Sequence, residues 1–212
     1  MEELLIGILG GFIVGIITAI VRSTLSGRLK LFQIFIPAQI RKTISWEYKN
    51  PKKAERSVAR DIETSSTMRV FCLKGATFCN EHESATKLPY RTLHRGKNLS
   101  SQKYLISSSA NPYINTRAIE LNISPRDLSR GVATSIQHLE NEQATPNSKV
   151  ELRKHNETVR FRLYIFDENL YLSYQPVNVK GCDCSVQKYP KGSNGYIALE
   201  AYFEELWEKY KI

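Results

Sequence analysis

The sequence predicts an α/β fold, with α+β as the alternative, placed after a single transmembrane helix. Two observations lead to this prediction. The chain opens with a long apolar run, and from about residue 54 short apolar segments of strand length alternate with segments of helical periodicity. Strands that alternate with helices form a sheet whose faces the helices cover. Residues 54–212 are therefore expected to form one domain.

The apolar run covers residues 4–21 and holds no charged side chain. A helix rises 1.5 Å per residue, so this run would span roughly 27 Å, enough for the hydrocarbon core of a bilayer. A signal peptide, the alternative, would begin with basic residues, whereas this chain begins Met-Glu-Glu and the run ends at Arg22. Residues 1–22 are expected to be a transmembrane helix.

Residues 22–60 carry ten basic and two acidic side chains, which is most of the net charge of +9. The positive-inside rule then places the domain in the cytoplasm, on a single-pass protein of the cell inner membrane. Residues 23–53 are expected to be a basic interfacial linker, with anionic lipid near residues 22–53; packing against the domain is the alternative.

Gly7, Gly11 and Gly15 recur every four residues in the apolar run. On a helix they form one smooth stripe, along which a second membrane helix can approach closely. They predict a homo-oligomer that assembles through the transmembrane helix. The alternative is that glycine is simply common in membrane helices.

The first elements of the domain follow from their apolar patterns. A helix is expected over residues 53–65, and the short apolar runs at residues 68–73 and 103–107 are typical of strands. Ser124 and Pro125 then open a helix as its N-cap and first residue. The apolar face of that helix consists of Leu128, Val132, Ile136 and Leu139.

Three strands and a helix complete the domain. The strands are expected over residues 149–154, 159–167 and 170–174, and a tight turn joins the last two. The closing helix extends from about residue 195 to residue 210. Its apolar row consists of Leu199, Phe203, Leu206 and Tyr210.

The strand at residues 159–167 reads VRFRLYIFD and carries two arginines on one face. Its alternation places Arg160 and Arg162 side by side, about 7 Å apart, opposite a face of apolar side chains. Two neighbouring guanidiniums predict a surface that binds an anion. The alternative is that both pair with surface carboxylates such as Glu151 or Glu157.

The spacing Arg160-x-Arg162-x-x-x-x-Asp167 resembles the HxKxxxxD motif of the phospholipase D superfamily. The surroundings are similar too, because a second strand ends in the polar residues 172–176, where the family has Gly-Ser-x-Asn, and an aromatic-rich helix closes the domain. The resemblance covers about residues 54–212. It implies a phospholipase D-like mixed sheet covered by helices.

The resemblance also implies that catalysis is lost. In the family a histidine attacks phosphorus and the lysine steadies the phosphate charge. Arg160 stands at the nucleophile position, where a guanidinium is a very poor nucleophile. Arg162 can still hold phosphate. A domain of this kind would keep its affinity for phosphodiesters.

No catalytic residue, metal site or cofactor is expected. The sequence has no GxxxxGK[ST], no HExxH and no nucleophile elbow. Its four cysteines lack the spacing of zinc ribbons or fingers. An enzyme that uses His155 or His94 as a displaced nucleophile is an alternative, although neither has a lysine at the spacing of the family.

The candidate ligand-binding residues are the two arginines with polar residues near strand ends: Arg160, Arg162, Ser107, Ser108, Tyr174, Gln175 and Lys188. Lys188 precedes a loop that enters the last helix, where backbone amides could hold a phosphate; an ordinary capped turn is the alternative. The expected ligand is a short oligonucleotide or a nucleotide messenger.

These features predict a membrane-anchored, homo-oligomeric sensor or effector. Its ligand would change how the domains associate, and the membrane helices would respond, in the manner of an ion channel or a membrane-disrupting protein. The layout is similar to that of bacterial anti-phage effectors. A membrane-bound phosphodiesterase or lipase and a protein-binding scaffold are the alternatives.

Overall fold

The computed structural model describes residues 46–48, 51–75, 98–179 and 183–211. These belong to the compact unit Lys42–Ile212. The predicted transmembrane helix, its glycines and most of the interfacial linker lie outside the described residues. Within the described ranges, no helix is both long and apolar enough to cross a membrane.

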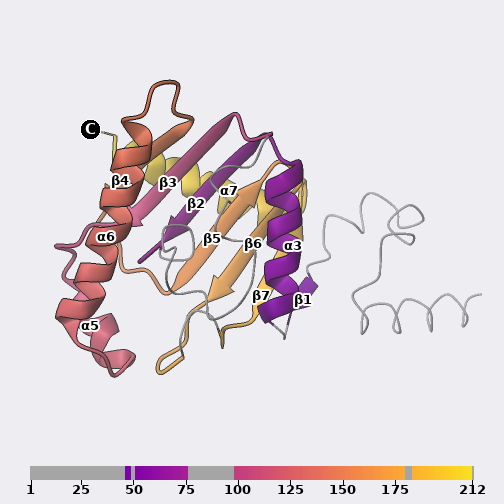
Figure 1. Cartoon of the computed structure of the whole chain (residues 1–212). Helices are drawn as coiled ribbons and strands as arrows, with labels where there is room; N and C mark the ends of the chain where they lie inside the picture. Colours follow the sequence, from indigo (N-terminus) through magenta and orange to yellow (C-terminus); the bar gives the residue numbers. More distant parts are fainter. Residues whose placement is uncertain (1–45, 49–50, 76–97, 180–182, 212) are drawn as a thin grey trace, which may run out of the picture. The chain divides into compact units, whose positions relative to one another are not determined.

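Seven strands form one mixed sheet in the order β1-β7-β6-β5-β2-β3-β4 (Figure 1). β2, β3 and β4 are parallel neighbours, whereas β5 is antiparallel to β2 and the strands β6, β7 and β1 continue the sheet antiparallel. The bounds are β1 Trp46–Tyr48, β2 Thr67–Cys72, β3 Ser101–Ser107, β4 Val150–His155, β5 Phe161–Phe166, β6 Asn169–Tyr174 and β7 Val186–Pro190.

Helices cover both faces of this sheet, which makes the domain an α/β fold, as predicted. α3 (Pro51–Thr64), α5 (Tyr113–Glu120) and α6 (Pro125–Gln143) lie on one face, and α7 (Asn194–Lys209) lies on the other (Figure 1). The core under α3, α5 and α6 includes Val58, Ile62, Val70, Tyr104, Ile114, Val132 and Phe166. The core under α7 includes Phe71, Leu105, Leu163, Ile165, Phe203 and Trp207.

The helices and strands predicted for residues 53–212 are all present, with ends within two residues of those expected. The sequence pattern does not predict β1, α5 or β7, which are short. β1 has three residues and α5 has eight, and α5 follows Pro112 without a side-chain cap. β7 reads VQKYP, and only its first residue is buried. β1 is part of the segment expected to be a linker and pairs with β7 in the sheet.

The two faces of β5 confirm the predicted alternation. Leu163 and Ile165 belong to the core under α7, while Tyr164 and Phe166 belong to the core under α3, α5 and α6. The face that carries the arginines is therefore buried along most of the strand. Among the described residues of this face, accessibility is greatest at the beginning of β5, where Arg160 precedes the strand.

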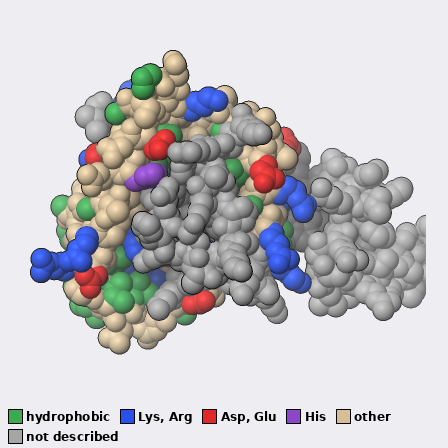
Figure 2. Space-filling view, viewed as in Figure 1, with side chains coloured by type: hydrophobic (Ala, Val, Ile, Leu, Met, Phe, Trp, Pro, Cys, Tyr) green, Lys and Arg blue, Asp and Glu red, His purple; other side chains and the backbone are tan. Residues whose placement is uncertain are grey.

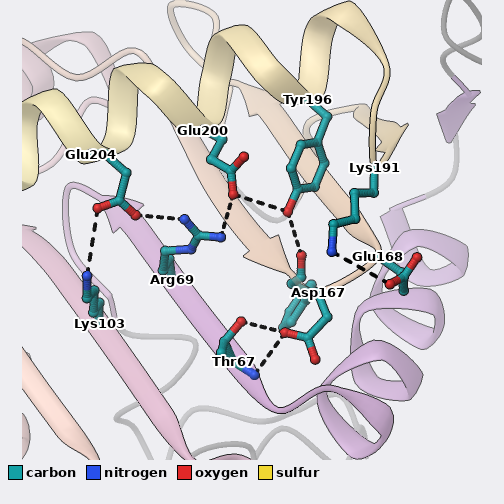
Figure 3. Close-up of polar contacts among 10 residues, drawn as sticks. Thr67, Arg69, Lys103, Asp167, Glu168, Lys191, Tyr196, Glu200 and Glu204 are labelled. Carbon is teal, nitrogen blue, oxygen red and sulfur yellow. Dashed lines mark hydrogen bonds and ion pairs between the residues drawn. The ribbon is translucent and has the colours of Figure 1, made fainter.

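Ion pairs fix α7 to its face of the sheet (Figure 3). Arg69 of β2 donates to Glu200 at 2.6 Å and to Glu204 at 2.7 Å, and Lys103 of β3 lies 3.7 Å from Glu204. Glu200 and Glu204 are one helical turn apart, so a single guanidinium reaches both. Tyr196 adds a hydrogen bond at 2.9 Å to the carbonyl of Phe166.

Asp167, the acidic position of the motif, ties the end of β5 to the start of β2. Its carboxylate accepts hydrogen bonds from the backbone N–H and the hydroxyl of both Ser66 and Thr67; the contacts with Thr67 are visible in Figure 3. Burial acts to raise the pKa of Asp167, but the hydrogen bonds outweigh burial and lower that pKa. These contacts give Asp167 a structural role.

The substitution Asp167→Asn is expected to lower the free energy of unfolding by about 1–3 kcal/mol, because an amide directs an NH2 group toward these donors. Denaturation of residues 42–212 by urea would show a lower midpoint with an unchanged slope. Asp127→Asn, which breaks an exposed ion pair with Arg130, is the matched control and should change stability by less than about 0.5 kcal/mol. An equally small decrease in the free energy of unfolding for Asp167→Asn would contradict a stabilising role for the hydrogen bonds that Asp167 accepts.

Candidate anion-binding site

The strand directions bring Arg160 to the edge of the sheet where the parallel strands end. β2 ends at Cys72, and Leu163 of β5 pairs with Phe71, so β5 begins beside the end of β2. β6 ends at the same edge, because Tyr174 pairs with Phe161. α5 also begins at this edge, after the turn that follows β3.

Glu120, at the end of α5, contacts two arginines through its two carboxylate oxygens. Oε1 accepts a hydrogen bond from Nη2 of Arg160, and Oε2 lies 2.8 Å from Nη1 of Arg117. The side chain of Arg160 is 38% exposed, that of Glu120 11% and that of Arg117 1%. The triad thus extends from the surface into the protein interior.

The electrostatics of this triad keep Glu120 ionised. The hydrogen bond from Arg117 is the main cause that lowers the pKa of Glu120; burial opposes the shift, and the charge of Arg160 adds to it. Two guanidiniums against one carboxylate leave the triad with one positive charge. Because Arg160 is half-exposed, this excess charge lies where an anion from solution could compensate it.

Arg117 also holds the loop that follows β6. Its Nη1 donates to the carbonyl of Pro176 at 3.0 Å and its Nη2 to the carbonyl of Val179 at 3.1 Å. The backbone N–H of Asn178 donates to the carbonyl of Glu120 at 3.1 Å. The loop and α5 are therefore joined at the site.

Two buried polar atoms beside Glu120 have no hydrogen-bond partner in the described part of the chain. They are Nε of Arg117 and the hydroxyl of Tyr113, whose residues are 1% and 8% exposed. Tyr113 and Arg117 are four residues apart on α5 and so share one face of it. Burial raises the pKa of Tyr113, and the charge of Glu120 raises it further, whereas the charges of Arg160 and Arg117 lower it. The hydroxyl therefore interacts electrostatically with all three residues of the triad.

Buried donors without partners are rare in proteins, because each loses its hydrogen bond to water. Here an N–H of a guanidinium and a phenolic O–H lie beside a triad of net positive charge. An anion with several acceptor oxygens would compensate that charge, and its oxygens are the acceptors that such donors require. The arrangement is therefore suited to hold an oxyanion.

Three other residues of the predicted site lie at the same edge of the sheet as Arg160. Arg162 is on the same face of β5 as Arg160, and its guanidinium lies 5.6 Å from the ring of Tyr164. Tyr174 is 56% exposed, and the backbone N–H of Gln175 donates to the carbonyl of Arg160 at 2.7 Å. These four residues share the edge of the sheet.

Ser107 and Ser108 instead shape the turn before α5. Ser107 is fully buried and accepts a hydrogen bond from the side chain of Asn111 at 2.9 Å, while the hydroxyl of Ser108 accepts one from the backbone of Ala110. Ser107 pairs with His155 across β3 and β4, so both belong to the face under α7. The structure does not bring Ser107 to the face of the arginines.

Lys188 belongs to a separate polar cluster under α3. Its Nζ lies 3.5 Å from the carboxylate of Asp61, and the hydroxyl of Tyr171 donates to the same carboxylate at 2.6 Å. The loop after β7 is a capped turn, because Ser193 accepts a hydrogen bond from the N–H of Tyr196. This agrees with the alternative reading of that loop.

His155 is fully buried, and both ring nitrogens are engaged. Nδ1 accepts a hydrogen bond from the N–H of Glu157 at 3.2 Å, and Nε2 lies 3.3 Å from the carbonyl of Cys72. The ring also packs against Phe71. This environment favours a neutral structural histidine over a displaced nucleophile. Within the described ranges, no group of three His, Cys, Asp or Glu side chains could hold a metal ion.

Exposed apolar side chains surround the loop and the end of α5. Ile119 is 75% exposed and Val177 is 49% exposed. Figure 2 shows hydrophobic side chains gathered at the lower left, over α5. This corner therefore combines the arginine cluster with apolar surface.

Tyr113, Arg117 and Glu120 are not among the site residues predicted from the sequence. All three lie on α5, a helix that the sequence pattern does not predict. One signal was available, because Arg117 and Glu120 have the i, i+3 spacing of an ion pair on a helix. No pattern in a single sequence connects Glu120 with Arg160, which lies forty residues further along the chain.

Comparisons with known proteins assign no family. No family model matches the chain, and no curated protein matches it. Among solved structures, the chain is similar to TrmBL2, described as an archaeal chromatin protein with a novel mode of DNA binding, with 13% identity and a TM-score of 0.44. The match covers 93% of this chain and 64% of that one. A likeness of this degree supports neither a shared fold nor a shared function.

Proposed function

We propose that this protein is a membrane-anchored, homo-oligomeric sensor or effector whose inactive phospholipase D-like domain binds a phosphodiester ligand. A short oligonucleotide or a nucleotide messenger has the required chemistry. The observation that carries the proposal is the triad of Arg160, Glu120 and Arg117, which has net positive charge. Nε of Arg117 and the nearby hydroxyl of Tyr113 are buried and have no hydrogen-bond partner among the described residues. Phosphate oxygens are strong acceptors for such donors.

Binding without catalysis is the function that these residues support. Arg160 stands at the position of the nucleophile in the motif, and its guanidinium contacts Glu120. A guanidinium does not lose its proton in proteins and so provides no attacking lone pair. The membrane anchor and the oligomer rest on the apolar run at residues 4–21 and its glycine stripe.

The test is ligand binding by the full chain in lipid nanodiscs. Short single-stranded oligonucleotides and cyclic dinucleotides are titrated against the wild type and the variant Arg160→Ala/Arg162→Ala. Loss of two charge-assisted contacts is expected to weaken binding on the order of 100-fold. The control Arg126→Ala/Arg130→Ala removes the same charge from exposed positions of α6 and should keep wild-type affinity. An equal loss in both variants would show only non-specific attraction.

A protein-binding role is the second candidate, favoured by the exposed Ile119 and Val177 near the arginines. The two functions differ in their dependence on salt. Binding to a phosphate backbone weakens steeply as salt is added, because bound counterions are released. Apolar contact with a protein would persist. A wild-type chain that binds none of the nucleic-acid ligands at low salt would contradict the first function.

A further inference from the structure

Glu120 places a fixed negative charge inside the candidate phosphate site. Its carboxylate contacts both Arg117 and Arg160, the two guanidiniums that would hold the ligand. It is only 11% exposed, and the backbone carbonyl of the same residue accepts a hydrogen bond from Asn178. The two guanidiniums therefore hold the carboxylate in place, and the backbone hydrogen bond fixes the end of α5 that carries it.

A phosphate held by the same guanidiniums must lie close to this carboxylate. The nitrogens of one guanidinium are near neighbours, so oxygens bound to its adjacent edges come within about 5 Å of each other. The first negative charge of a ligand is compensated by the net positive charge of the triad. A second negative charge on the same phosphate would exceed the net charge of the triad and would be repelled by Glu120.

We propose that Glu120 is a specificity-determining residue that selects monoanionic phosphodiesters over dianionic phosphate monoesters. This inference rests on the proposed function and names the ligand class of the same site. The half-exposed guanidinium of Arg160 suits a monoanion, because it can donate to the two unesterified oxygens of one phosphodiester.

A matched pair of probes tests the selection without any mutation. Adenosine 3′,5′-cyclic monophosphate and adenosine 5′-monophosphate share base and sugar but carry one and two phosphate charges at pH 8. The full chain in nanodiscs is expected to bind the cyclic diester about tenfold more tightly at pH 8. At pH 5.5 the monoester is mostly monoanionic, since its second pKa is about 6, and the preference should shrink to about twofold.

The expected loss of preference at pH 5.5 comes from protonation of the monoester and not from titration of the protein. The charged and titratable groups described around Glu120 are Arg117, Arg160, Tyr113 and Tyr174. Arg117 holds the pKa of Glu120 below its ordinary value, so the carboxylate stays ionised over the whole range. Affinity for the diester should therefore stay constant between pH 8 and pH 5.5.

Two variants assign the selection to Glu120. Glu120→Gln removes the negative charge and should raise affinity for the monoester at pH 8 about tenfold, with a smaller gain for the diester. Glu205→Gln makes the same change of charge at an exposed position of α7, on the opposite face of the sheet, and should leave the ratio unchanged. If Glu120→Gln fails to fold, the comparison of the two probes at pH 8 and pH 5.5 on the wild type still tests the selection.

Each outcome bears on one of the two claims. Equal affinity for both probes at pH 8, or an unchanged ratio in Glu120→Gln, would overturn the selection and leave phosphate binding intact. Binding of oligonucleotides without binding of either mononucleotide would also overturn it, because the site would then not recognise a single phosphodiester. No binding of any phosphate compound would overturn the proposed function itself.

Discussion

Acidification from pH 7.5 to pH 5 is expected to lower the free energy of unfolding by about 2 kcal/mol through His155, with a total loss of about 3 kcal/mol by pH 4. Burial is the main cause that lowers the pKa of His155 from 6.5 to about 4; the carbonyl of Cys72 and the charge of Glu157 oppose the shift. The folded protein thus keeps the ring neutral while the unfolded chain takes up a proton.

The direction follows from that difference in proton uptake. Above pH 6.5 neither state binds the proton, so the stability that depends on the neutral ring is fully present. As the pH falls from 6.5 toward 4, the unfolded state is stabilised by protonation and the folded state is not. Carboxylates with lowered pKa, such as Glu120 and Asp167, lose their contribution only below about pH 4.5, because their ordinary pKa values lie there.

Urea denaturation of residues 42–212 at pH 7.5, 6 and 5 measures this effect. The variant His155→Gln should be less stable at pH 7.5, and its stability should change much less over the same interval. In parallel, the ring resonances of His155 should not titrate above about pH 5. A ring that titrates near pH 6.5, or equal pH dependence in variant and wild type, would contradict a buried neutral histidine.

The sequence predicts best those elements that carry their own periodic signal. α6 begins at the predicted Ser124-Pro125 boundary, and each residue of its predicted apolar face is buried. β5 alternates as expected because its two faces enter two different cores. α5 and β7 lack such signals, since α5 is short and uncapped and β7 is mostly polar. They are ordered by the elements on which they pack.

The candidate site was predicted in part for the same reason. Alternation correctly places Arg160 and Arg162 on one face, but their environment depends on strand order and on α5, which are long-range properties. Ser107 ends β3 at the same edge of the sheet as Arg160. Its position in the alternation nevertheless places its side chain on the face under α7. The antiparallel pairing of β6 with β7 places Lys188 beside Tyr171 and Asp61.

Replacement of the buried guanidinium, Arg117→Met, is expected to lower the free energy of unfolding by about 3–5 kcal/mol. Arg117 is 1% exposed and compensates Glu120, which is itself mostly buried. The substitution leaves that carboxylate with Arg160 alone and removes the donors to the carbonyls of Pro176 and Val179. A buried acceptor without a donor costs about 1–3 kcal/mol.

The matched control for this prediction is Arg130→Met. Arg130 also pairs with an acidic residue three positions away, but its side chain is 65% exposed, so its loss should cost less than about 0.5 kcal/mol. Denaturation of residues 42–212 would measure both variants, and hydrogen exchange in Arg117→Met should be fastest in the loop at residues 175–179.

Arg117→Lys separates charge from geometry at the same position. A lysine keeps the positive charge, but one ammonium cannot reach Glu120 and two loop carbonyls with the fork of a guanidinium. We expect Arg117→Lys to lose only about half of the free energy of unfolding that Arg117→Met loses. A variant as stable as the wild type would mean that charge alone stabilises α5. A loss below 1 kcal/mol for Arg117→Met would contradict a structural role for the buried pair of Arg117 and Glu120. Such a result would also mean that Arg117 does not hold Glu120 rigidly in the proposed phosphate site.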